Sequence, residues 1–171
     1  MVLPTSYMGS VEWYRLFLAN PSGVQIEVME SFPKQTYRNR CTITTPDGPL
    51  NLSIPVKRAD SKQLTRDVEI SYQQRWQHQH WIALTSAYKR TPYFDYCADF
   101  FRPFYEKETK FLVDFNEKIH EVIVRLMANQ AKGEEAKRLL GKNRTTDWQG
   151  LDLEPCFGNG QSILDLLFEY G

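Results

Sequence analysis

The pattern of apolar and polar positions divides the chain into strands and helices. An apolar start over residues 1–7 precedes a turn and a helix that begins at Val11. Residues 24–28 then alternate apolar and polar side chains, as is typical of a half-buried strand. The Asn-Pro-Ser-Gly segment at residues 20–23 separates helix from strand, because proline and glycine end helices. The beginning of the chain is therefore predicted to be a β-α-β unit.

A second alternating region predicts a β-hairpin. Cys41 and Ile43 alternate with threonines, and apolar residues recur at every second position over residues 50–56. Between these runs, residues 46–48 read Pro-Asp-Gly, which are residues that tight turns favour. The two runs are therefore expected to pair as antiparallel strands.

The remainder of the chain shows helical spacing. Apolar residues recur at intervals of three and four, so that one face of each segment would be buried. Ser162 is expected to cap the last helix, because a serine hydroxyl can accept a hydrogen bond from a free N–H of the first turn. Helices are predicted over residues 73–89, 93–105, 110–127 and 162–168, with a shorter one over residues 134–140.

The elements together predict one α/β domain that spans residues 1–171. A chain of 171 residues, 42% of them apolar, can bury a sizeable core without dividing into two domains. Because the β-α-β opening requires parallel neighbours and the hairpin antiparallel ones, we expect a mixed sheet, covered by several long helices.

Charge and cysteine content exclude several classes of function. Lys plus Arg and Asp plus Glu both total 21, so no broad attraction to nucleic acid or an anionic membrane is indicated. No apolar run has the roughly 20 residues that a membrane span needs, and no signal segment is recognisable. The cysteines, Cys41, Cys97 and Cys156, lack metal-ligand or disulfide spacing. A cytoplasmic protein with reduced thiols is expected.

The most unusual stretch is basic and lies just before the hairpin, over residues 34–41. If the strand begins near Arg38, alternation sets Arg38 and Arg40 on one face, where they would form a fork for a phosphate or carboxylate. The alternative is a solvated strand entry with surface ion pairs, or a structural pairing with a carboxylate such as Asp165. The candidate anion-binding residues are Lys34, Arg38 and Arg40, with Asn39 or Gln35 as neutral donors.

His80 is the candidate catalytic acid or base, because it interrupts an apolar helical stripe and histidine titrates near neutral pH. A core histidine with a satisfied hydrogen bond is the alternative. Trp76 and Tyr88 would belong to a stacking wall for a ligand, or to the core. The other aromatic residues of this group are Trp81, Tyr93, Phe94 and Tyr96. Cys41 is expected to face inward rather than act as a nucleophile, and Asp165 to form a structural pair.

Several phrases resemble the WbqC-like protein family. They are the Pro-Lys-Gln-Thr-Tyr-Arg-Asn-Arg run at residues 33–40, Leu-Ser-Ile-Pro-Val at 52–56, Trp76 with His80 and Trp81, Ala87 and Tyr88, Pro-Tyr-Phe at 92–94, and the 162–168 segment. The resemblance implies a bacterial cytoplasmic protein linked to surface-polysaccharide biosynthesis of the O-antigen type. One feature departs from many relatives, which open with a His-Gln-Pro phrase where this chain has Leu3-Pro4-Thr5.

Two functional hypotheses follow. Common nucleotide-binding, hydrolase and zinc-protease phrases do not occur in the chain. The first hypothesis is a transferase that binds the phosphates of an activated sugar or acyl donor through Lys34, Arg38 and Arg40, with His80 as acid or base. The second is a non-catalytic accessory protein in which the same cations hold a protein carboxylate. The sequence specifies neither a cofactor nor an oligomeric state.

Overall fold

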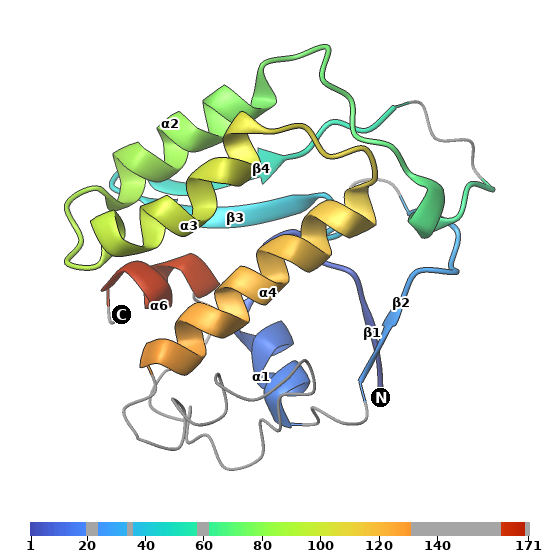
Figure 1. Ribbon diagram of the computed structural model, residues 1–171, viewed down its shortest axis with the longest axis horizontal. Helices are drawn as coiled ribbons and strands as arrows, with labels where there is room; N and C mark the ends of the chain where they lie inside the picture. The colour runs from blue at the N-terminus through green and yellow to red at the C-terminus, as the bar shows by residue number, and fades with distance from the viewer. Residues whose placement is uncertain (20–23, 34–35, 58–61, 131–161, 170–171) are drawn as a thin grey trace.

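The structure is a computed structural model, and it describes residues 1–19, 24–33, 36–57, 62–130 and 162–169 (Figure 1). Figure 1 shows a hairpin covered by two helices in one half of the molecule and a β-α-β unit in the other. A long helix, α4 (Leu112–Gln130), crosses between the two halves. Because α4 contacts elements from both halves, its side chains are placed to build a site between them.

The opening of the chain forms the predicted β-α-β unit. Strand β1 (Val2–Pro4) pairs in parallel with β2 (Gln25–Glu27), and helix α1 (Val11–Ala19) connects them. The Ser10 hydroxyl accepts a hydrogen bond of 3.3 Å from the Trp13 N–H, so a side chain satisfies a free donor of the first turn. The prediction for this part of the fold is confirmed.

The predicted hairpin is also present, as β3 (Arg40–Thr45) and β4 (Gly48–Ser53). Cys41 and Ile43 of β3 are buried, and the intervening threonines are not. Gly48 has a φ of 114°, which residues with a side chain rarely adopt. The local turn chemistry therefore closes the hairpin at the expected place.

The two pairs of strands were expected in one mixed sheet, whereas the described residues form two separate two-stranded sheets. The Tyr7 N–H donates to the Tyr37 carbonyl at 2.9 Å, which links the segment after β1 to the segment before β3. The Ser6 hydroxyl donates to the same carbonyl at 3.3 Å, and these bonds join the two regions without extending either pair of strands.

The helices occur where their spacing predicts them, within a few residues at each end. They cover the hairpin and each other, because α2 contacts β3 and α3, and α4 contacts α3 and α6. Their bounds are α2 (Trp76–Tyr88), α3 (Phe94–Glu106), α4 and α6 (Ile163–Glu169), with a short 3-10 helix at Thr65–Asp67. The helix expected over residues 134–140 lies outside the described residues. In the described ranges, none of the helices combines the length and apolar character that crossing a membrane requires.

Candidate functional site

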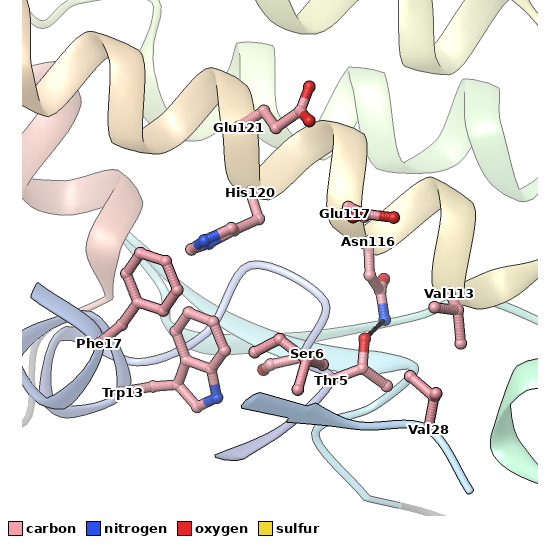
Figure 2. A pocket seen from close by; sticks show the side chains of 11 residues that line it. Thr5, Ser6, Trp13, Phe17, Val28, Val113, Asn116, Glu117, His120 and Glu121 are labelled. Atoms are coloured by element: carbon pink, nitrogen blue, oxygen red, sulfur yellow. Dashed lines mark hydrogen bonds between the residues drawn. The ribbon is translucent and has the colours of Figure 1, made fainter. Parts of the chain in front are cut away.

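A cavity of about 430 Å³ lies between α1 and α4, and we refer to it as the α1–α4 cavity (Figure 2). Figure 2 shows Trp13 and Phe17 of α1 on one side, and Asn116 and His120 of α4 on the other. The loop after β1 contributes Thr5 and Ser6 to the lining, and the other lining residues are Ile26, Val28, Val113, Glu117 and Glu121. Its volume falls in the range of small-molecule sites, about 300 to 1,000 Å³.

The α1 side of the cavity is aromatic. The rings of Trp13 and Phe17 stack with centroids 5.6 Å apart and planes 5° from parallel. Residues four apart on a helix lie on the same face, which is why one turn of α1 presents both rings together. The indole Nε1–H donates to the Pro4 carbonyl at 3.0 Å, and this bond fixes the orientation of the Trp13 ring.

His120 lies against these rings. Its imidazole meets Phe17 edge-on with centroids 4.4 Å apart, and it stacks on Tyr14 at 5.3 Å. Burial lowers the pKa of His120 from 6.5 to about 4, because the charged form is poorly solvated there. Its Nδ1 atom is buried and has no hydrogen-bond partner among the described residues. At neutral pH the ring is therefore uncharged and can use one nitrogen as an acceptor.

Asn116 joins three segments at the floor of the cavity. Its Nδ2 donates to the Arg38 carbonyl at 2.8 Å and to the Thr5 hydroxyl at 3.2 Å, the second of which is drawn in Figure 2. The residue is only 2% exposed, yet its Oδ1 atom has no partner within the described part of the chain. Both amide hydrogens are thus in use, and a buried acceptor is left over.

Glu117 and Glu121 form the exposed acidic part of the lining. Neither belongs to any ion pair between described residues, and no lysine or arginine is among the described residues that line the cavity. Across the described ranges, no three His, Cys, Asp or Glu side chains are grouped so as to hold a metal ion. The cavity consequently combines aromatic rings with hydrogen-bond acceptors.

Arg38 lies at a second, adjoining cavity of about 280 Å³, which shares Thr5, Ser6 and Trp13 with the first. Its Nε donates to Oε1 of Glu30 at 2.6 Å, and its Nη2 lies 2.6 Å from the same oxygen. The guanidinium is therefore already paired with a carboxylate.

The other residues of the basic stretch occupy different environments. Lys34 and Gln35 lie outside the described residues. Arg40 is half-buried at the start of β3, and its Nε has no partner among the described groups. Asn39 is buried and donates to the Ile54 carbonyl at 2.9 Å. Since β3 begins at Arg40, strand alternation does not place Arg38 on the same face, and Arg40 does not line the Arg38 cavity.

His80 is buried within a network of tyrosines. Tyr7 Oη shares a hydrogen bond of 3.0 Å with His80 Nδ1 and one of 2.8 Å with Tyr105 Oη. Burial lowers the pKa of His80 to about 4, although a hydrogen bond with the Ser53 backbone opposes the shift. His80 lines neither the α1–α4 cavity nor the Arg38 cavity, so its catalytic role stays a prediction.

The aromatic candidates of α2 pack in the interior. Trp76 is 2% exposed, and Tyr88 donates a hydrogen bond of 2.6 Å to Oδ1 of Asp165. Asp165 also accepts from the Thr44 hydroxyl at 2.8 Å and from the Ser162 N–H at 3.2 Å. The structural pairing expected for Asp165 is confirmed, and so is the cap, because the Ser162 hydroxyl accepts from the Leu164 N–H.

Cys41 faces inward, as expected for a strand cysteine. Burial raises the pKa of its thiol far above the ordinary value, which makes the thiolate rare at neutral pH. Cys97 is a buried free thiol as well, with its pKa raised to about 11. Cys156 lies outside the described residues.

The α1–α4 cavity was not anticipated from the sequence. A signal was present, because Asn116 and His120 are four residues apart on α4, and Glu117 and Glu121 repeat the same interval. These pairs form a polar stripe beside the apolar one. Nothing in the spacing, however, identifies Trp13 as the residue that faces this stripe.

Fold and cavity together define a mixed α/β protein with a cavity of the size that small molecules occupy. The model of the WbqC-like protein family matches residues 27–154, which is more than half of the chain, and the chain belongs to this family. No curated protein and no solved structure matches it. The matched range begins well after Leu3, which is buried and does not line the cavity.

Proposed function

We propose that the protein recognises a sugar in the α1–α4 cavity, as a cytoplasmic component of bacterial surface-polysaccharide biosynthesis. The observation that supports this most is the stacked pair of Trp13 and Phe17 opposite the polar side chains of Asn116 and His120. Flat aromatic rings pack against the apolar C–H face of a sugar, while amide, imidazole and carboxylate groups bind its hydroxyls. The biosynthetic setting is the one that resemblance to the family implies.

A transferase is the first form of this proposal. An activated sugar carries phosphates beside the ring, and the Arg38 cavity adjoins the sugar cavity through Thr5, Ser6 and Trp13. With the sugar over Trp13, the phosphates would reach Arg38, whose planar guanidinium suits them once they replace Glu30.

A sugar-binding accessory protein without catalysis is the second form, and two observations favour it. Arg38 is already neutralised by Glu30. His80, which is buried, and His120, which is half-buried, both have a pKa of about 4, whereas a general base works best with a pKa near the operating pH.

Calorimetric titration of the protein with hexoses, amino sugars and their nucleotide-activated forms tests sugar recognition. Trp13→Leu is expected to weaken binding of every ligand at least tenfold, because it removes the aromatic surface. Trp81→Leu is the matched control, since Trp81 is also half-buried but does not line the cavity. Failure of the whole panel to bind, or equal binding by both variants, would refute the proposed function.

Arg38→Ala separates the two forms of the proposal. A transferase should lose affinity for the nucleotide-activated sugars and keep its affinity for the free sugars. An accessory protein should bind free and activated sugars alike, with or without Arg38. Arg40→Ala serves as the comparison on the same stretch, because Arg40 does not line the Arg38 cavity.

A further inference from the structure

The described polar groups that line the α1–α4 cavity provide more free hydrogen-bond acceptors than free donors. Carboxylates accept and do not donate, and the described residues of the lining include two of them and no lysine or arginine. Asn116 has already committed its amide hydrogens to Thr5 and to the Arg38 carbonyl. The lining thus offers mainly acceptors, and a ligand that fits it supplies donors.

The Oδ1 atom of Asn116 is independent evidence that the ligand supplies hydrogen-bond donors. Asn116 is only 2% exposed, and its Oδ1 atom has no hydrogen-bond partner among the described groups. Leaving a buried carbonyl without a hydrogen-bond partner is destabilising, so such atoms are rare unless something binds them. Figure 2 shows the Asn116 side chain extending from α4 toward Thr5, at the floor of the cavity.

The two exposed carboxylates of the lining, which form the rim of the cavity, favour a positively charged ligand. Glu117 and Glu121 are one turn apart on α4, where like charges repel each other. Neither forms an ion pair with a cation in the described part of the chain. A positively charged ligand would remove this repulsion, and the faces of Trp13 and Phe17 attract cations as well.

From these observations we propose that the α1–α4 cavity selects an amino sugar and binds its ammonium group between Asn116 Oδ1 and the carboxylates of Glu117 and Glu121. An ammonium group has three N–H donors and a positive charge, which matches an acceptor-rich, acidic lining. The sugar ring then lies against Trp13 and Phe17. This inference rests on the proposed function and names the substrate class of that same site.

The test compares ligands that differ at one position of the ring. Glucosamine, glucose and N-acetylglucosamine are titrated into the full chain by calorimetry at low ionic strength. Glucosamine is expected to bind at least tenfold more tightly than the two uncharged sugars. The preference should shrink in 0.5 M salt, because rim charges are screened by ions.

Variants of the rim assign the preference to named residues. The double variant Glu117→Gln, Glu121→Gln should lose the tenfold preference for glucosamine over glucose, because glutamine has no charge. Both residues are exposed, so the fold should tolerate the changes. Asp114→Asn is the matched control, because Asp114 is an exposed carboxylate of the same helix that does not line the cavity.

The possible outcomes distinguish selection of an amino sugar from sugar recognition in general, which is the proposed function. Equal binding of the three sugars, with loss of binding in Trp13→Leu, would overturn amine selection and leave sugar recognition standing. A simple amine such as n-butylamine binding as tightly as glucosamine would also overturn it, because the ring would then contribute nothing. If no sugar binds, the proposed function is refuted, and amine selection with it.

Discussion

Single residues in this protein gain their roles from partners that are distant in the sequence. Asp165 holds together β3, α2 and the start of α6 through the Thr44 hydroxyl, the Tyr88 hydroxyl and the Ser162 N–H. A buried carboxylate needs such donors, because removing it from water without them is costly. Tyr88 was expected either in a stacking wall for a ligand or in the core, and in the structure its hydroxyl belongs to this network.

Tyr88→Phe is expected to destabilise the fold by about 1.5 to 3 kcal/mol, the usual contribution of a hydrogen bond to a charged group. The physical reason is that Asp165, only 5% exposed, loses its 2.6 Å donor and cannot recruit water easily. Urea unfolding measures the change in the free energy of unfolding. Tyr96→Phe, at a site 51% exposed, is the control and should change it by less than about 0.5 kcal/mol. Equal small effects of both substitutions would contradict a structural role for Tyr88.

Among the elements, the hairpin shows how local chemistry sets geometry. The turn between β3 and β4 requires a φ of 114° at Gly48, and no heavy atom lies within 4 Å of the position a Cβ would take there. Any penalty for a side chain at this position therefore comes from the backbone and not from a clash. This is why the Pro-Asp-Gly phrase could be recognised in the sequence.

Gly48→Ala should lower the free energy of unfolding by about 1 to 2 kcal/mol, because alanine rarely adopts a positive φ. Thermal or urea unfolding followed by circular dichroism measures it. The control is Asp47→Ala in the same turn, at an exposed position without this constraint, with an expected effect below about 0.5 kcal/mol. If the two variants are equally stable, the positive φ is not a constraint on the hairpin.

Over the whole molecule, two histidines on different helices, the buried His80 and the half-buried His120, are neutral in the folded protein at neutral pH. Tyr7 and Tyr105 surround His80, and the rings of α1 surround His120. Burial lowers both pKa values from 6.5 to about 4. Protonation of either histidine therefore opposes folding.

Stability should fall as pH drops from about 6.5 to about 4, because the unfolded chain takes up protons there that the folded chain excludes. Each histidine contributes on the order of 3 kcal/mol to this loss, which is complete below pH 4 and absent above pH 6.5. Urea unfolding at a series of pH values measures the slope of the free energy of unfolding against pH.

His120→Gln should flatten this slope, since glutamine does not titrate in this range. His78→Gln is the control, because His78 is exposed on α2 and should leave the slope as it is in the wild type. A wild-type slope retained in His120→Gln would show that the imidazole of His120 does not have a lowered pKa in the folded protein.

The sequence by itself determined the local elements of this protein. The β-α-β opening, the hairpin and the capped α6 follow from periodicity, turn residues and a serine at the right place, all of which act over a few neighbouring residues. The phrase at residues 33–40 likewise indicated the family. What the local pattern could not show was whether Arg38 would meet Arg40 or Glu30.

Only the tertiary structure decided which side chains share a cavity. Asn116 binds Thr5, a residue 111 positions away, and this contact brings the polar stripe of α4 to the aromatic face of α1. Packing of this kind depends on how helices and strands meet in space, and no local period encodes it. For that reason the basic stretch and His80 stood out in the sequence, whereas the candidate site formed around Trp13, Asn116 and His120.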